Sequence, residues 1–117
     1  MGKTVLIVDD EVDVLDSLKD AFEFEGYTVV TAPDGAAALV RLGELNELPC
    51  AAVLDVFMPK MTGVELYEAM KLDERLARVS VIFCTSAPAS APRGAMVMKK
   101  PIDLDRLVGE VRARCTQ

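Results

Sequence analysis

The hydrophobic residues of this 117-residue chain follow two patterns that alternate along its length. Short apolar runs rich in β-branched residues are typical of strands, whereas apolar residues spaced three and four apart are typical of helices. The strand-type runs are residues 4–8, 27–31, 51–56, 80–85 and 95–99. Helical spacing falls between or after them, at residues 15–26, 36–45, 64–70 and 104–111. Strands that alternate with helices predict an α/β fold with a doubly wound parallel sheet of five strands.

One connection departs from this alternation. Only nine residues, SAPASAPRG, lie between Thr85 and Ala95, and two of them are prolines. A crossover between parallel strands usually takes a dozen or more residues and contains a helix, which proline opposes. Nine extended residues reach about 30 Å, more than the roughly 17 Å of a five-residue strand. We therefore expect a crossover that is non-helical or very short and leaves one face of the sheet thinly covered.

Composition and charge limit the class of protein. With 51% hydrophobic and 27% charged residues, the chain suits a single globular domain over residues 1–117. A net charge of −6 argues against direct binding to nucleic acid, which clustered Lys and Arg normally provide. The longest apolar runs are far shorter than the roughly 20 residues of a membrane span, and no signal-peptide pattern begins the chain. We predict a cytoplasmic protein with no membrane partner.

The three cysteines give no sign of a metal or catalytic thiol site. Cys50, Cys84 and Cys115 are widely spaced, and the chain has no histidine to complete a zinc set or a Cys-His pair. Cys84 lies inside an apolar run, where cysteine behaves as a small hydrophobic residue. The sequence predicts buried, reduced thiols.

Residues with phosphate or magnesium chemistry end four of the apolar runs. Asp9 and Asp10 follow VLIV, Asp55 follows AAVL, Thr85 ends VIFCT, and Lys100 follows MVMK. The carboxyl ends of parallel strands meet at one edge of a sheet, where α/β proteins place their ligands. We expect three carboxylates, a hydroxyl and an ammonium group to share one shallow site.

Each of these residues has an ordinary structural explanation when it is taken alone. An aspartate after a strand often caps the next helix or makes a turn, and a lysine is usually a solvated surface residue. Three carboxylates at one edge, however, repel each other unless a cation joins them. Mg²⁺ takes such hard oxygen ligands together with water and phosphate, so the cluster predicts Mg²⁺ as its cofactor. Pro101 keeps Lys100 extended and so fixes where its side chain leaves the strand.

These segments resemble the receiver domain of two-component response regulators. VLIVDDE, VLDVFMPKMTG, FCTSA and KKPI match the four signature segments of that family in order and spacing, apart from the short stretch after Thr85. Pro59 and Gly63 match the loop that follows the phosphoacceptor. The resemblance covers essentially the whole chain and implies a flavodoxin-like fold, here with an atypical fourth helix that is missing or shortened.

The resemblance implies a role for each residue of the cluster. The implied roles are Asp55 as phosphoacceptor and also Mg²⁺ ligand, Asp10 as a direct Mg²⁺ ligand, Asp9 as a ligand acting largely through water, the main-chain carbonyl of Phe57 as a further ligand, and Lys100 and Thr85 as partners of the phosphoryl oxygens. Phosphoryl transfer needs an in-line nucleophile and cations around the phosphoryl group, and a carboxylate is already ionised near neutral pH. The physical chemistry therefore agrees with the resemblance.

The resemblance also implies the partners. The phosphoryl donor would be the phosphohistidine of a histidine kinase or of a histidine phosphotransfer protein, or a small phosphodonor. A chain without histidine is not itself that donor. We expect an acceptor that changes its protein contacts, not an enzyme that turns over an external substrate.

Two departures from the family pattern concern the output. The family usually has an aromatic residue three positions before the lysine, and this chain has Val97. The missing fourth helix would uncover apolar surface, which commonly marks a binding site, so we expect a downstream protein target or a rearranged homodimer to cover it. Phe57 beside the phosphoryl group, with the small Ala87 opposite, suggests slow autodephosphorylation.

Three alternatives have different sequence requirements. A receiver-like interaction module would keep the fold and signal without phosphorylation. A phosphatase of the haloacid-dehalogenase type requires a second aspartate two positions after the nucleophilic one, and two positions after Asp55 this chain has Phe57. A flavodoxin-like nucleotide binder would have a Gly- or Ser/Thr-rich loop after the first strand, where this chain has Asp9-Asp10-Glu11.

Overall fold

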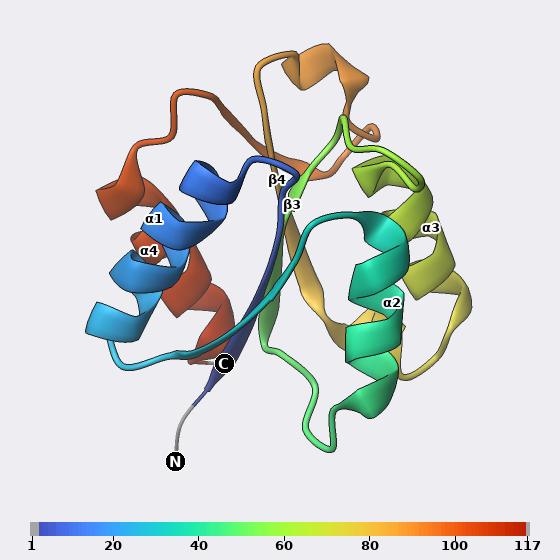
Figure 1. Cartoon of the computed structure of the whole chain (residues 1–117), viewed down its shortest axis with the longest axis horizontal. Coiled ribbons are helices and arrows are strands. Elements are labelled where there is room, and N and C mark those ends of the chain that lie inside the picture. The colour runs from blue at the N-terminus through green and yellow to red at the C-terminus, as the bar shows by residue number, and fades with distance from the viewer. Residues whose placement is uncertain (1–2, 117) are drawn as a thin grey trace.

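A computed structural model of the chain describes residues 3–116 and contains one parallel sheet of five strands, in the order β2-β1-β3-β4-β5, with helices on both faces (Figure 1). The elements are β1 (Thr4–Val8), α1 (Val12–Phe24), β2 (Thr28–Ala32), α2 (Gly35–Glu44), β3 (Ala51–Asp55), α3 (Gly63–Leu72), the 3₁₀ turn η1 (Leu76–Arg78), β4 (Ser80–Thr85), the 3₁₀ turn η2 (Pro88–Ser90), β5 (Met96–Lys99) and α4 (Leu104–Cys115). This arrangement confirms the predicted doubly wound α/β fold. Within the described residues, no helix is both long enough and apolar enough to cross a membrane.

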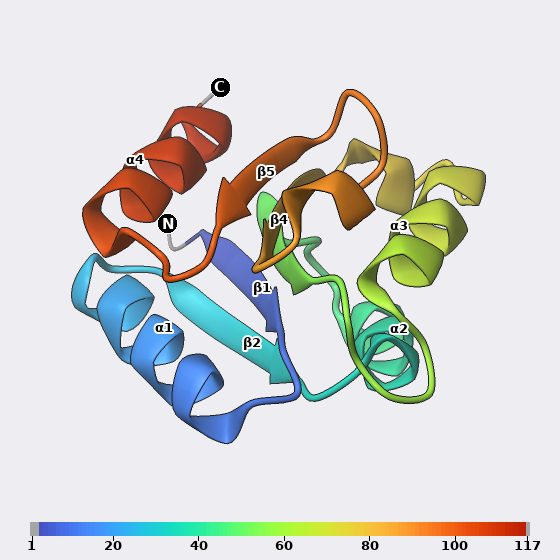
Figure 2. The same cartoon turned by 90° about the horizontal axis from the view of Figure 1, so that it is seen from above.

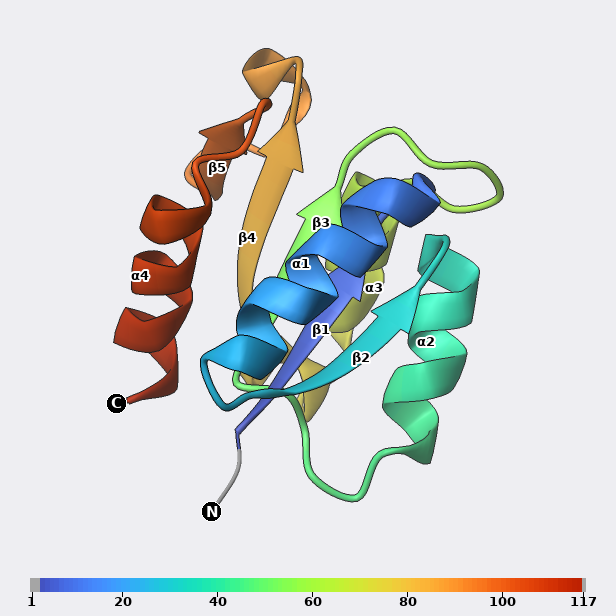
Figure 3. The ribbon, with the colours of Figure 1, turned by 60° about the vertical axis from the view of Figure 1, so that its left-hand side comes forward.

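Alternate residues of each strand pack into two separate hydrophobic layers, because successive side chains of a strand point to opposite faces. In β1, Val5 and Ile7 pack with the helices α1 and α4, whereas Leu6 and Val8 pack with α2 and α3. All four side chains are fully or almost fully buried. Figures 2 and 3 show the same two layers, with α1 and α4 on one face and α2 and α3 on the other. The continuous apolar runs of the sequence are therefore strands covered on both faces.

Side-chain caps begin α2 and α3, the helices that follow β2 and β3. The Oδ1 of Asp34 accepts the N–H of Ala37 at 2.8 Å at the start of α2. At the start of α3, Thr62 and Glu65 form a capping box, in which each side chain accepts the other residue's backbone N–H. Such caps stabilise a helix by about 1 kcal/mol each. The box at Thr62 sets where α3 begins after the loop that leaves β3.

The crossover between β4 and β5 has the short, non-α-helical form that the sequence predicts. Within it, the structure has the single 3₁₀ turn η2 in place of an α-helix. Val81 of β4, Val97 of β5 and Ala95, which directly precedes β5, are half-buried on the side of α3. A groove of about 560 Å³ lies there, between α3, η1, the first residues of β4 and β5, and the last turn of α4.

The prediction for the cysteines is correct for Cys84 and wrong for the other two. Cys84 is a buried free thiol in β4. Cys50 and Cys115, which are 65 positions apart in sequence, are joined by a disulfide with a Cα–Cα distance of 5.1 Å. Cys50 directly precedes β3 and Cys115 ends α4, and the fold brings the start of that strand and the end of that helix together. Their spacing in sequence carries no sign of this pairing.

A substitution at Gly63 tests how closely α3 is packed against the end of β3. A Cβ atom added at Gly63 would lie 1.9 Å from the main-chain oxygen of Asp55, and the Gly63 N–H donates to the Val56 oxygen at 2.9 Å. Backbone atoms cannot move aside as a flexible side chain can, so Gly63→Ala should lower the free energy of unfolding by about 2 to 4 kcal/mol.

Gly109→Ala is the matched control for chemical denaturation. Nothing lies within 4 Å of a Cβ added at Gly109, which is exposed in α4. Because alanine is the better helix former, this change should leave stability equal or raise it by up to about 1 kcal/mol. Equal effects of the two substitutions would contradict the close contact at Gly63.

Candidate functional site

The carboxyl ends of four neighbouring strands form a compact polar cluster. Asp55 and Thr85 are the last residues of β3 and β4, Asp9 and Asp10 follow β1 directly, and Lys100 follows β5. One carboxylate oxygen from each of Asp9, Asp10 and Asp55 lies within 4.8 Å of the other two. The structure thus brings together the four charged side chains that the sequence places at strand ends, and it places Thr85 at the end of the neighbouring strand β4. We call Asp9, Asp10, Asp55 and Lys100 the acidic pocket.

Lys100 is the cation of the acidic pocket. Its Nζ lies 2.9 Å from the Oδ2 of Asp9, 3.7 Å from the Oδ1 of Asp55 and 3.8 Å from the Oε1 of Glu11. The backbone N–H of Lys100 donates to the Thr85 oxygen at 2.9 Å, so β4 fixes where the side chain starts. The contact with Glu11 was not anticipated from sequence, although Glu11 follows the acidic pair directly.

Burial makes the charge on Asp55 unfavourable. Asp55 is 8% exposed, and loss of solvent together with the negative charge of Asp9 raises its pKa from 3.8 to about 6. Lys100 and the Val56 N–H, which donates to Oδ1 at 2.9 Å, act in the opposite direction, and Asp10 adds a further small rise. Repulsion and burial therefore outweigh the favourable partners.

The same cluster acts differently on Lys100. Burial opposes its positive charge, but the hydrogen bond that its Nζ donates to Asp9 and the negative charges of Asp9, Asp55 and Glu11 outweigh burial, so the pKa of Lys100 is raised. Lys100 therefore keeps its positive charge at neutral pH. The pocket holds a permanent ammonium group beside a carboxylate whose ionisation is costly.

The donor set of the pocket fits a hard divalent cation. Asp9 is 3% exposed and its Oδ1 accepts the Glu11 N–H at 2.9 Å, whereas Asp10 is exposed and open to water. The three carboxylates carry two more negative charges than Lys100 neutralises. Carboxylate oxygens with an open side for water are the surroundings that Mg²⁺ prefers, so these residues could hold a metal ion.

Thr85 connects the pocket to the crossover that follows β4. Its side chain is fully buried, and its Oγ1 accepts the N–H of Ala87 at 3.1 Å. Ala87 directly precedes η2, and its oxygen accepts the Ser90 N–H at 2.9 Å. The hydroxyl at the pocket edge is therefore tied to the segment that replaces a helical crossover.

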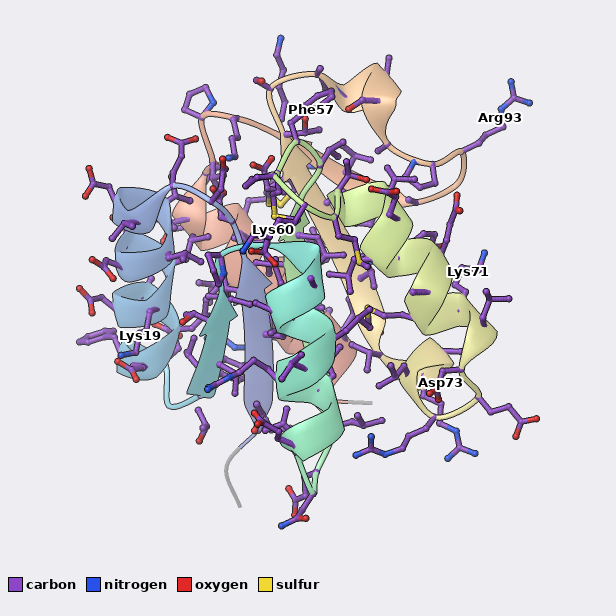
Figure 4. All side chains as sticks on the ribbon, turned by 45° about the vertical axis from the view of Figure 1, so that its right-hand side comes forward. Lys19, Phe57, Lys60, Lys71, Asp73 and Arg93 are labelled. Carbon is purple, nitrogen blue, oxygen red and sulfur yellow. A yellow bond between two sulfur atoms is a disulfide. The ribbon has the colours of Figure 1, made fainter. Side chains whose placement is uncertain are left out.

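Phe57 and Val97 are the residues that the family resemblance connects with dephosphorylation and output. Phe57 is two residues past Asp55 and is 59% exposed; Figure 4 places it at the end of the molecule where η2 lies. Val97 pairs with Phe83 in the β4–β5 register and is half-buried. Tyr67 of α3 packs edge-on against Phe83, with 5.4 Å between ring centroids. An aromatic ring therefore lies near this part of the sheet, but it comes from α3 and not from β5.

Fold and pocket together define an α/β domain whose chemistry lies beyond the carboxyl ends of its strands. Residues 5–112 match the model of the response regulator receiver domain family. The chain belongs to this family.

Individual relatives give the same result. The transcriptional regulatory protein PrrA of Mycobacterium tuberculosis is 36% identical over 114 residues, which is 93% of this chain and 48% of PrrA. The chain thus spans about half the length of this relative. A putative response regulator from Chloroflexus aurantiacus has a TM-score of 0.89 at 27% identity, with full coverage of both chains. A Borrelia burgdorferi CheX–CheY complex with BeF3 and Mg has a TM-score of 0.82 at 26% identity, covering 95% of this chain and 87% of that one.

The raised pKa of Asp55 predicts how stability depends on pH without metal. The folded-state pKa of about 6 exceeds 3.8, so the folded protein binds this proton more tightly than the unfolded chain does. The cost of ionising Asp55 is therefore absent below about pH 4, grows between pH 4 and 6, and is complete above pH 6. Asp55→Asn should raise the free energy of unfolding by about 1 to 2 kcal/mol at pH 8 and by little at pH 4.

Thermal melts in the presence of a chelator test this pH dependence. Asp20→Asn, which changes an exposed carboxylate of α1, is the matched control and should lack the gain at pH 8. If Asp55→Asn stabilised the protein equally at pH 4 and pH 8, the ionisation cost would be refuted.

Proposed function

We propose that this chain is the phosphoacceptor receiver of a two-component phosphorelay and that Asp55 takes the phosphoryl group. The observation that carries the proposal is the position of the Asp55 carboxylate, buried at a strand end and 3.7 Å from the ammonium group of Lys100. Membership of the receiver family supports it. The domain is a single unit over residues 1–117 and acts as an acceptor, not as an enzyme that turns over an external substrate.

The geometry supports a nucleophilic role for one oxygen of Asp55. Oδ1 accepts the Val56 N–H at 2.9 Å, which fixes the carboxylate plane. Among the described residues, Oδ2 accepts no such bond and is left for attack. In the transfer, a carboxylate oxygen forms an O–P bond while the N–P bond of a phosphohistidine breaks, and the imidazole leaves. No general base is needed, because the nucleophile is already an anion.

The other residues of the pocket would provide positive charge to the phosphoryl oxygens, either directly or through a bound metal ion. Lys100 pairs with a phosphoryl oxygen and in doing so exchanges part of its contact with Asp9. Asp9, Asp10, Asp55 and the main-chain carbonyl of Phe57 would hold Mg²⁺, Asp9 largely through water, and the ion would supply positive charge to the phosphoryl oxygens. The CheY structure that contains BeF3 and Mg supports this choice of ion for a similar protein.

The output passes through Thr85. When its hydroxyl bonds a phosphoryl oxygen, the bond that it accepts from Ala87 is weakened or re-aimed, and the crossover with η2 shifts. The groove beside α3 is lined by Gly94 and Ala95 at the end of this crossover, and its two charged lining residues, Lys71 and Arg114, are both cationic. A downstream protein target with an acidic, partly apolar segment fits that groove. The donor is a histidine kinase or a histidine phosphotransfer protein, and the chain works in the cytoplasm.

Incubation with acetyl phosphate and Mg²⁺ tests the proposal. Intact mass spectrometry should show a gain of about 80 Da, one phosphoryl group, in the wild type and in Asp20→Asn, and no gain in Asp55→Asn. Hydrogen exchange with a beryllofluoride mimic should change over residues 85–100. No adduct would contradict the proposal and favour an interaction module that signals without phosphorylation. An adduct without any change in exchange would contradict the output through Thr85.

Phe57 should control how long the phosphoryl group lasts. Its exposed ring lies beyond Asp55 and restricts the approach of hydrolytic water, so the wild type should dephosphorylate slowly. Phe57→Asn removes the apolar ring and adds a group that orients water, so it should shorten the half-life of the adduct about tenfold, equivalent to about 1.4 kcal/mol in the barrier. Phe24→Asn, at an exposed phenylalanine that ends α1, is the control. An unchanged half-life in Phe57→Asn would refute this role.

A further inference from the structure

The disulfide lies away from the acidic pocket and has no part in the proposed phosphorylation. Cys50 directly precedes β3, whereas Asp55 is the last residue of that strand. A five-residue strand spans roughly 17 Å, so the two sites lie at opposite ends of the sheet. Reactions of the disulfide can therefore be measured without changing the acidic pocket.

The two cysteines differ in exposure in a way that orders a reaction. Cys50 is half-buried, and its backbone N–H donates to the Thr4 oxygen at 2.9 Å, which fixes the residue at the start of β1. Cys115 is 2% exposed at the end of α4. Cys50 is the thiol that a small oxidant reaches first.

Cys84 shows the contrast with a thiol that has a packing role. It is buried in β4, and burial raises its pKa to about 12, so it stays protonated. Lys100 lowers that pKa, and Asp9 and Asp55 raise it further. Cys84 lies inside the sheet, and the disulfide of the structure joins the other two cysteines. Of the three cysteines, Cys50 and Cys115 are the two that the fold brings within bonding distance.

We propose that Cys50 and Cys115 form a redox modification site that takes a low-molecular-weight disulfide, such as oxidised glutathione, as its oxidant. The Cys50 thiolate attacks one sulfur of the oxidant, the S–S bond of the oxidant breaks, and one thiolate leaves. The Cys115 thiolate then attacks the sulfur of Cys50, the S–S bond between the two cysteines forms, and the second thiolate leaves. Two electrons pass from the protein to the oxidant, the two leaving thiolates take up the two protons that the cysteines lose, and excess thiol reverses both steps.

The bond controls how firmly the last turn of α4 is held to the sheet. Without it, α4 keeps the buried Leu107 and Val111 and the ion pair between Arg112 and Glu25, so the reduced protein stays folded. With it, a covalent link closes a chain segment of 65 positions, which restricts the unfolded chain strongly. Arg114, next to Cys115, lines the groove beside α3, so the redox state also acts at one wall of that groove.

The first measurement counts thiols in Cys84→Ser, which leaves only the pair. After equilibration with oxidised glutathione, denaturation and alkylation, this variant should take up no alkylating reagent, and peptide mapping should find Cys50 linked to Cys115. Removing Cys115 as well should leave one glutathione on Cys50, whereas removing Cys50 as well should leave Cys115 unmodified. Two free thiols in Cys84→Ser, or links between separate molecules, would overturn the proposal.

The second measurement compares the oxidised and reduced wild type. Oxidation should raise the melting temperature by about 5 to 15 °C and slow amide exchange in the last turn of α4. The variant Cys50→Ser/Cys115→Ser should show neither response and should still gain about 80 Da from acetyl phosphate, because its acidic pocket is intact. A disulfide that forms with no change in melting temperature or exchange would overturn the control of α4. This result is independent of whether Asp55 accepts phosphate.

Discussion

Repulsion among three carboxylates that share one end of the sheet is the constraint on which the rest of this site depends. Asp9 and Asp55 are buried, Asp10 is exposed beside them, and the side chain of Lys100 offsets only part of their charge. The raised pKa of Asp55 is the direct sign of that imbalance. A protein selected for stability alone would not keep such a cluster, because each buried like charge costs free energy. Added positive charge would relieve this repulsion, and the cluster therefore fits a site that binds a cation together with a phosphoryl group.

The fold creates this cluster and also separates it from other functions. Parallel strands bring their carboxyl ends to one edge, and the caps that start α2 and α3 hold the surrounding loops. At the opposite end of the sheet, the same topology brings Cys50 to Cys115. Thr85 is the link between the pocket and the crossover that carries η2, because its hydroxyl accepts the N–H of Ala87. The acidic pocket, the disulfide and this crossover thus occupy different ends or edges of one sheet.

The sequence predicted those features that local pattern determines. Apolar runs gave the strands to within one residue at each end, and the nine-residue connection correctly implied a crossover without an α-helix. The convergence of Asp9, Asp10, Asp55 and Lys100 followed from parallel pairing alone. Two features could not be predicted in this way. The contact of Glu11 with Lys100 depends on side-chain geometry, and the disulfide between Cys50 and Cys115 depends on a contact between residues 65 positions apart. Tyr67 was likewise placed on a helix, but its packing against Phe83 depends on how α3 lies over the sheet.

The central claim is that the acidic pocket directs a phosphoryl group to one oxygen-bearing side chain, Asp55. Its most direct measurement is chemical trapping: protein treated with acetyl phosphate and Mg²⁺ is reduced with borohydride, which converts an aspartyl phosphate to homoserine, and the position is read by tandem mass spectrometry. The account predicts homoserine at position 55 alone, and only when Mg²⁺ is present. Homoserine at Asp9 or Asp10, or none at any position, would contradict it.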